Sequence, residues 1–224
     1  MSAPVRALTV LERRVTQCAR CPRLVAYRER IAREKRRAYA AETYWGRPVP
    51  AFGDSRARLV IVGLAPGAHG SNRTGRMFTG DASGDWLYAA LFRYGFASQP
   101  VATSRADGLT LRDCWITAAA RCAPPENKPT PEELANCRPW LARELELLTR
   151  RRVVLVLGRV GHDAFLKVSG WRARFAHGAV TRLPDGTWLV ASYHPSRQNT
   201  NTGKLTRAMW HAVFRRVRAL VDRG

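Results

Sequence analysis

Two hydrophobic patterns alternate along the chain: short uninterrupted apolar runs, and longer stretches whose apolar residues recur at helical spacing. Residues 59–62 and 153–157 are continuous apolar runs, which are typical of strands buried on both faces of a parallel sheet. Residues 114–120 and 187–193 have the pattern of two further strands. The sequence therefore predicts four strands, each separated from the next by a helical segment.

Segments with apolar residues on one helical face fill the intervals around these strands. The predicted helices cover residues 5–39, 85–94, 130–148, 161–168 and 205–221. The third has a strong start signal, because Thr130 can cap, Pro131 suits the first helical position and Glu133 completes a capping box. The alternation predicts an α/β fold, a three-layer sandwich with a central, largely parallel four-stranded sheet flanked by helices.

The organisation of the chain indicates one domain. A length of 224 residues suits a single core, and no internal repeat, low-complexity tract or clear boundary divides the sequence. Residues 44–54 lose the helical period and are expected to form a loop. We therefore expect one domain over residues 1–224, with the N-terminal helical segment as part of it.

The charge points to an anionic partner. The chain has 38 Lys and Arg residues against 17 Asp and Glu, a formal net charge of +21. So much positive charge repels itself, and nucleic acid is the leading candidate to relieve that repulsion. The alternative is an arginine-rich genome or a thermophilic habit that fills solvated faces with arginine.

The sequence also limits where the protein works. No run of about 18 apolar residues could span a bilayer, and the start MSAPVRALTVLERR lacks the apolar stretch and cleavage site of a secretory signal. We therefore expect a cytoplasmic protein with no membrane contact.

The five cysteines indicate a metal site more than a disulfide framework, since they are few and unevenly spread. Cys18 and Cys21 form a C-x2-C pair within chelating reach, and Cys122 and Cys137 can complete four soft ligands for zinc or an iron–sulfur cluster. Spacing alone does not choose between these metals, and buried structural cysteines are the alternative. Cys114 lies in an apolar strand, where a small buried residue is the simpler role.

Two loops that follow strands hold the candidate chemistry, because ligands of open parallel sheets bind at the carboxyl ends of strands. In residues 63–81, glycines allow close backbone approach, Phe78 offers a flat face for a base, and Arg73 and Arg76 offer charge to phosphate. The loop has neither a Walker motif nor G-x-G-x-x-G spacing, so a generic glycine-rich turn is the alternative. The second loop begins at His194, and a lone histidine is more often structural than catalytic.

Taken together, the motifs resemble the uracil-DNA glycosylase superfamily, specifically its iron–sulfur family 5. The resemblance rests on the N-terminal cysteine pair, GLAPGAHG, NRTGRMFTGDASG, RCAPPENKPTPEELANC and HPSRQNT, and it covers nearly the whole chain. It implies a uracil-DNA glycosylase-like fold and a 4Fe–4S cluster. The cluster ligands that it implies are Cys18, Cys21, Cys122 and Cys137.

The resemblance also implies roles for single residues. Phe78 matches the aromatic residue that stacks on the flipped base, His194 the histidine that stabilises the departing base, and Asp81 the carboxylate that positions or activates water. The remaining candidates for substrate binding have four roles, in the order of the residues given next: backbone amides of the first motif that face the base, a side chain that contacts the base edge, one that contacts a flanking phosphate, and one that enters the vacated base stack as a wedge. These candidates are Gly63, Ala65, Gly67, Ala68, Asn127, Ser196 and Arg197.

Three of these candidates carry open alternatives or a departure from the related family 4. Asn127 stands between prolines and a lysine and is equally a turn residue. Gln198 could replace Arg197 as the wedge. Family 4 has an acidic residue in the first motif and, before the third cysteine, an asparagine that reads the uracil edge. At these positions this chain has Ala68 or a neighbour and Ala118, so strict uracil selectivity is not expected.

The activity that the resemblance implies is a monofunctional DNA glycosylase that hydrolyses the N-glycosidic bond of uracil, hypoxanthine or xanthine in DNA. No lysine stands out as an amine nucleophile, so an abasic product without strand cleavage is expected. A catalytically silent iron–sulfur nucleic-acid-binding protein of the same fold is the alternative. A metal-dependent nuclease is disfavoured because no carboxylates cluster. The expected partner is damaged DNA, and the expected state is a monomer.

Overall fold

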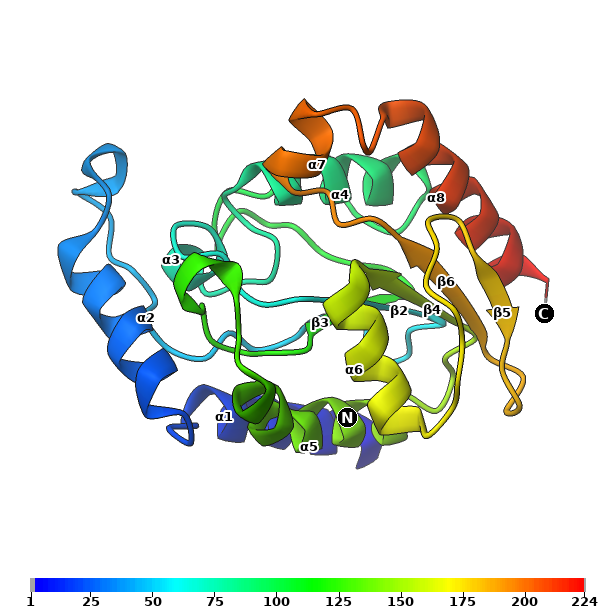
Figure 1. Ribbon diagram of the computed structural model, residues 1–224, viewed down its shortest axis with the longest axis horizontal. Coiled ribbons are helices and arrows are strands. Elements are labelled where there is room, and N and C mark those ends of the chain that lie inside the picture. The colour runs from blue at the N-terminus through cyan, green and yellow to red at the C-terminus, as the bar shows by residue number, and fades with distance from the viewer. Residues whose placement is uncertain (1–2, 224) are drawn as a thin grey trace.

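The computed structural model describes residues 3–223, and it contains one mixed sheet. Residues 1–2 and 224, which the sequence analysis included in its single domain, lie outside the described residues. The sheet has six strands in the order β1-β3-β2-β4-β6-β5 (Figure 1). Their bounds are β1 Phe52–Gly53, β2 Leu59–Gly63, β3 Cys114–Ala118, β4 Val153–Leu157, β5 Val180–Arg182 and β6 Trp188–Ser192.

The four predicted strands are β2, β3, β4 and β6, and they form the parallel centre of the sheet. The prediction of four strands in all was wrong, because β1 and β5 add one antiparallel strand to each edge. These edge strands have two and three residues and no fully buried side chain, so they leave no alternating pattern in the sequence. Their position is set by pairing with a neighbour.

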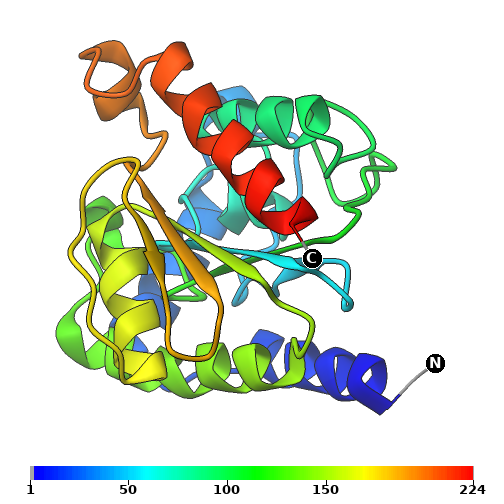
Figure 2. The ribbon, with the colours of Figure 1, turned by 90° about the vertical axis from the view of Figure 1, so that its right-hand side faces the viewer.

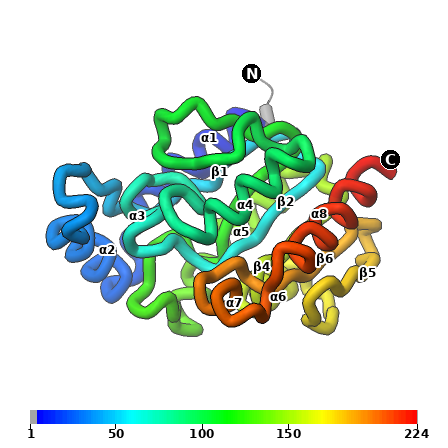
Figure 3. Tube along the Cα trace, turned by 90° about the horizontal axis from the view of Figure 1, so that it is seen from above, coloured from blue at the N-terminus to red at the C-terminus, as the bar shows by residue number. Residues whose placement is uncertain are grey.

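Helices cover both faces of the sheet, as the three-layer prediction requires. On one face lie α1 (Ala3–Thr16), α5 (Pro131–Leu147) and α6 (Arg159–Ser169), and on the other lie α4 (Ala82–Arg93) and α8 (Arg207–Asp222) (Figures 1 and 2). Figure 3 views the molecule from the side of α4 and α8, with the short α7 (Arg197–Asn201) beside them. The α/β sandwich is therefore confirmed.

The alternation of side chains along the strands divides the core into two layers. In β2, Leu59 and Ile61 pack toward α4 and α8, whereas Val60 and Val62 pack toward α1, α5 and α6. All four side chains are fully buried, which explains why these strands read as continuous apolar runs.

The N-terminal segment differs from the single helical stretch predicted over residues 5–39. It consists of α1, α2 (Pro22–Glu34) and a 3-10 turn, η1 (Arg37–Tyr39). Cys21 is extended at the break, because Pro22 disfavours helix in the residue before it and itself suits the first helical position. The C-x2-C pair therefore lies at a helix junction and not within one helix.

The other helix predictions agree with the structure within a few residues. The capping box at Thr130 and Glu133 is present at the start of α5, where each side chain bonds the other residue's backbone N–H. Within the described residues, no helix is both long and apolar enough to cross a membrane.

Candidate functional site

Phe78 and His194 come from different loops and lie face to face. Phe78 follows α3 (Ser71–Thr74) in the long loop after β2, and His194 follows β6 directly. Their ring centroids are 5.8 Å apart with an interplanar angle of 27°. The Phe78 ring is 8% exposed, so this pair forms a flat and nearly buried surface at the carboxyl end of the parallel strands.

Glycines make room for this pair. A Cβ at Gly63 would lie 2.9 Å from two carbons of the Phe78 ring, and one at Gly84 would lie 1.8 Å from the Phe78 carbonyl oxygen. Gly158 has a φ of +86°, and a Cβ there would approach the His194 Cβ to 3.3 Å. These glycines therefore leave the space that the two rings occupy.

His194 is held through its backbone on both sides. Its carbonyl oxygen accepts a hydrogen bond from the Asn199 side-chain amide at 2.9 Å. The preceding residue, Tyr193, donates its N–H to Nδ1 of His177 at 3.1 Å and stacks on the His177 ring. Burial lowers the pKa of His194 to about 4, so its imidazole is neutral at neutral pH.

The two oxygens of the Asp81 carboxylate have different surroundings. Oδ1 accepts a hydrogen bond from the Gly84 N–H at 3.0 Å and thereby caps α4. Oδ2 faces the backbone of the first motif, since a Cβ at Gly67 or Gly70 would lie 3.0 or 2.0 Å from it. Burial raises the pKa of Asp81, while hydrogen bonds from Gly84 and Ser83 and the charge of Arg197 oppose that rise.

The backbone of the first motif is fixed next to Asp81. Gly63 accepts a hydrogen bond from Ala119 N–H, Gly67 accepts one from Asn72 N–H, and the Asn72 side chain also reaches the Ala68 carbonyl at 3.5 Å. Ala65 is half-buried beside them. Within this motif, Gly67 therefore lies next to the Asp81 carboxylate, and Gly63 lies next to the Phe78 ring.

Ser196 and Arg197 begin a short helix, as the sequence suggested. The Ser196 hydroxyl accepts from the Asn199 N–H at 3.4 Å and caps α7, and the Arg197 side chain is exposed. Asn127 is also exposed and lies in the 3-10 turn η2 (Pro125–Asn127) with a φ of 58°. That left-handed backbone is the turn geometry that asparagine tolerates well.

The two arginines of the loop do not offer their charge to phosphate, and that expectation was wrong. The Arg73 side chain is 7% exposed; it pairs with Glu42 and donates to the carbonyls of His69 at 2.8 Å and Gly80 at 3.1 Å. The Arg76 side chain is 5% exposed and pairs with Asp107. Protein acceptors occupy both guanidinium groups: a carboxylate and two carbonyls for Arg73, and a carboxylate and the Thr79 hydroxyl for Arg76. Both arginines therefore hold the loop together.

Four cysteines line one small cavity between the N-terminal helices and α5. They are Cys18, Cys21, Cys122 and Cys137. Arg28 donates to Cys122 Sγ at 2.9 Å, and Asn136 donates to Cys21 Sγ at 3.5 Å. Cys114 is fully buried in β3 and is not part of this cavity, which agrees with its expected structural role.

The cysteine cavity does not have the geometry of a single-ion site. Within residues 3–223, no three His, Cys, Asp or Glu side chains converge closely enough to hold one metal ion. A tetrahedral zinc needs all its sulfurs about 2.3 Å from one point. The four soft donors therefore line one cavity without converging on a single point.

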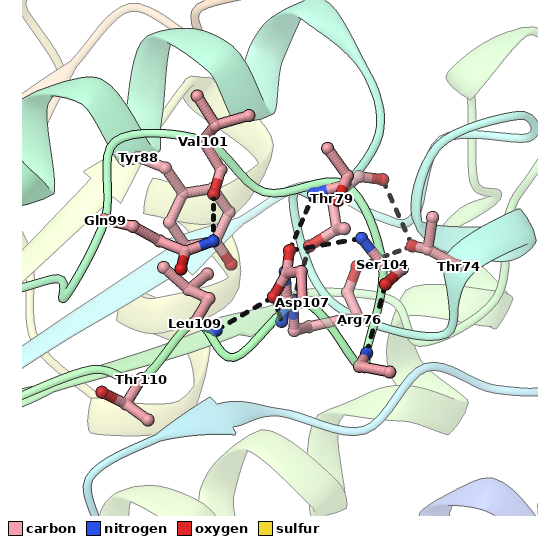
Figure 4. A network of polar contacts seen from close by, with 12 residues as sticks. Thr74, Arg76, Thr79, Tyr88, Gln99, Val101, Ser104, Asp107, Leu109 and Thr110 are labelled. Atoms are coloured by element: carbon pink, nitrogen blue, oxygen red, sulfur yellow. Dashed lines mark hydrogen bonds and ion pairs between the residues drawn. The ribbon is translucent and has the colours of Figure 1, made fainter.

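Sequence reasoning missed the residues that support the loop from outside the motifs. Asp107, Tyr88 and His177 lie outside the motifs in sequence, and no spacing or composition marks them. The Asp107 carboxylate accepts hydrogen bonds from both terminal nitrogens of Arg76, at 2.8 and 2.6 Å, in the network that Figure 4 shows. Only the tertiary contacts reveal these supports.

Comparison with known proteins agrees with this geometry. The family model of the uracil DNA glycosylase superfamily matches residues 50–218. A type-5 uracil-DNA glycosylase of Thermus thermophilus is 53% identical over 209 residues, which cover 92% of this chain and 94% of the relative. The type-5 enzyme of Pyrobaculum aerophilum is 51% identical, with 92% and 90% covered.

The chain belongs to the type-5 uracil-DNA glycosylases. A type-4 uracil-DNA glycosylase of Archaeoglobus fulgidus is more distant, at 37% identity over 66% of this chain and 70% of the relative. The resemblance inferred from the motifs is thus confirmed. In this type-5 chain the superfamily match includes both glycosylase loops, whereas Cys18 and Cys21 precede it.

Proposed function

We propose that the chain hydrolyses the N-glycosidic bond of uracil in DNA and leaves an abasic site in an intact strand. The observation that carries this proposal is the facing pair of Phe78 and His194 at the carboxyl end of the sheet, with the Asp81 carboxylate across from the first motif. The relatives that cover most of the chain are named type-5 uracil-DNA glycosylases. Family and geometry therefore support the same reaction.

The first requirement is to take the base out of the duplex. Extruding a nucleotide costs a few kcal/mol, and stacking on an aromatic ring returns about 1–3 kcal/mol per base. Phe78 supplies the ring, and the net charge of +21 attracts the phosphate backbone. Ser196 stands at a helix start suited to a phosphate, and Arg197, exposed beside it, is placed to enter the vacated stack.

Breaking the bond from C1′ to the base leaves its electron pair on the base and positive charge on the sugar. His194 is suited to the base because its neutral imidazole can donate an N–H to an oxygen that becomes negative. Backbone N–H groups of Gly63, Ala65, Gly67 and Ala68 are further donors for the base edge. A preorganised donor of this kind lowers the barrier without reorganising during the reaction.

Asp81 completes the hydrolysis. Its Oδ1 caps α4, so its Oδ2 is the oxygen left for chemistry. As a carboxylate it stabilises the sugar cation and orients the water whose oxygen bonds to C1′. One water proton then goes to Asp81 or solvent, and the hydroxyl remains on the sugar.

We extend the proposal to deaminated bases beyond uracil. Ala118 at the end of β3 is buried and has no polar group with which to read a uracil edge. The larger hypoxanthine and xanthine are therefore expected substrates. Asn127 is a candidate edge contact, provided that its exposed turn folds toward the base when DNA is bound.

We propose that the four cysteines of this cavity hold an iron–sulfur cluster. A 4Fe–4S cluster takes four thiolates and, being several atoms wide, keeps them further apart than one ion does. Cys18, Cys21, Cys122 and Cys137 would hold it, and it would join the N-terminal helices to α5. Bound there, the cluster would stabilise the fold. Protein prepared without oxygen should contain about four irons and four sulfides per chain, whereas stoichiometric zinc without acid-labile sulfide would reject the cluster.

The decisive test of function uses matched oligonucleotides that contain uracil, hypoxanthine, xanthine or only normal bases. Strands with a deaminated base should break only after alkali, because hydrolysis leaves the backbone intact. Breakage before alkali would contradict a monofunctional enzyme. DNA binding without release of any deaminated base would support a catalytically silent iron–sulfur protein instead.

A further inference from the structure

Phe78 has a backbone conformation that its own sequence does not favour. Its φ is 53°, in the left-handed region that residues other than glycine, asparagine and aspartate rarely adopt. In this conformation the ring meets His194 and packs on Gly63. Surrounding contacts must therefore supply the free energy that holds it.

Side-chain hydroxyls bond the carbonyls of the residues before and after Phe78. The Met77 carbonyl accepts from the Tyr88 hydroxyl at 2.7 Å and from the Thr79 hydroxyl at 3.2 Å. The Thr79 carbonyl accepts from the Thr74 hydroxyl at 3.2 Å. The carbonyls of both residues next to Phe78 are thus oriented by hydrogen bonds. Figure 4 shows Thr74 and Thr79 within this network.

An ion pair anchors these contacts. Arg76 donates through Nε to the Thr79 hydroxyl at 2.9 Å and through its two terminal nitrogens to Asp107. Both charged side chains are more than nine-tenths buried, at 5% and 9% exposure. Burial alone would raise the pKa of Asp107, but Arg76 and the N–H groups of the Asp107 loop hold that pKa below its ordinary value.

Asp107 connects this anchor to a segment outside every motif. It accepts N–H hydrogen bonds from Thr103 at 2.8 Å and Leu109 at 3.0 Å. The same segment also accepts the Gly80 N–H, two residues after Phe78, through the Ala102 carbonyl at 3.1 Å. A charged pair of this kind fixes direction as well as distance, because the guanidinium is planar and both its ends are occupied.

We infer that Asp107, through Arg76 and Thr79, is a positioning residue that keeps the Phe78 ring in its base-stacking place. The inference rests on the stacking role proposed for Phe78 above. It assigns a part in substrate positioning to the segment around residues 99–109, to which the sequence motifs gave no function.

A double-mutant cycle tests this inference through single-turnover release of uracil. Asp107→Asn should lower the rate roughly 10- to 100-fold, as expected for a misplaced positioning group, while affinity for undamaged DNA stays unchanged. In a Phe78→Ala background the same substitution should cost nothing, because the ring that it positions is absent. Asp113→Asn is the matched control: Asp113 pairs with Arg58 before β3, at the opposite end of the sheet, and its loss should leave the rate unchanged.

Thr79→Val provides a second, milder variant if Asp107→Asn folds poorly. It removes one hydroxyl, keeps the ion pair, and should show a smaller rate loss that also disappears in the Phe78→Ala background. A rate loss that persists in that background, or a wild-type rate for both variants, would overturn the inference. A wild-type rate for Phe78→Ala alone would instead refute the stacking role, and with it any positioning of that ring.

Discussion

In the proposed reaction, His194 acts on the base and Asp81 on the sugar side of the bond that breaks, and the surroundings of the two residues differ accordingly. Burial keeps the His194 imidazole neutral, with its backbone held by Asn199. The Oδ1 of Asp81 caps α4, and its Oδ2 faces the first motif. Each residue can therefore be altered with a substitution that isolates its chemistry.

His194→Ala and Asp81→Asn should each lower the single-turnover rate about 100- to 1000-fold, a usual loss for one electrostatic group, with little change in DNA affinity. Asparagine is also a good N-cap, so Asp81→Asn removes the charge and keeps α4 capped. The His194 loss should differ between uracil and hypoxanthine, whereas the Asp81 loss should not. A near-normal rate for Asp81→Asn on both substrates would reduce this carboxylate to a cap.

The lowered pKa of His194 also predicts a pH dependence of stability. Between pH 6.5, the ordinary pKa of histidine, and a pH of about 4, His194 is protonated in the unfolded chain but neutral in the folded chain. The unfolded state then binds more protons, so this contribution falls as the pH drops from about 6.5 to about 4. His194→Gln should show a shallower loss of urea stability across this window. Equal slopes for the two proteins would contradict burial as the cause.

At the scale of elements, α5 connects the cysteine cavity to the rest of the fold. It carries Cys137, its capping box is formed by Thr130 and Glu133, and Glu133 also accepts from Arg23 of α2 at 2.8 and 2.7 Å. The start of α5 thus joins two of the elements that bring cysteines together.

Thr130→Ala should destabilise the protein by about 1 kcal/mol, the usual cost of losing an N-cap, and should also hasten loss of iron in a chelator. Thr206→Ala is the matched control, since Thr206 caps α8 through Met209 N–H and α8 carries no cysteine. Denaturant unfolding and the visible absorbance measure the two effects. Equal iron loss in both variants would mean that general stability, and not the start of α5, protects the metal.

At the scale of the whole molecule, the charge of +21 should govern DNA binding. Affinity should fall steeply with salt, with a log–log slope of about 0.9 for each phosphate neutralised. Fluorescence anisotropy of an undamaged duplex between low and physiological salt measures this slope. A nearly flat dependence would mean that the arginines reflect composition and not a DNA-binding face.

Local patterns in the sequence determined the sandwich, the four central strands and the candidate loops. Strands such as residues 59–62 and 153–157 are buried on both faces, so all their residues are apolar and the sequence shows their burial. The motif loops and the four cysteines could also be identified from the sequence. Glycine and proline affect the backbone at single positions, and cysteine has a distinctive chemistry.

Tertiary structure alone decided the edge strands, the break at Pro22 and the residues that brace the site. β5 exists because β6 offers an unpaired edge, and Asp107 matters because folding brings it to Arg76, 31 positions earlier in the chain. The same contacts turned Arg73 and Arg76 from expected phosphate ligands into internal supports. Such pairings depend on distances between remote segments, which no local pattern of residues encodes.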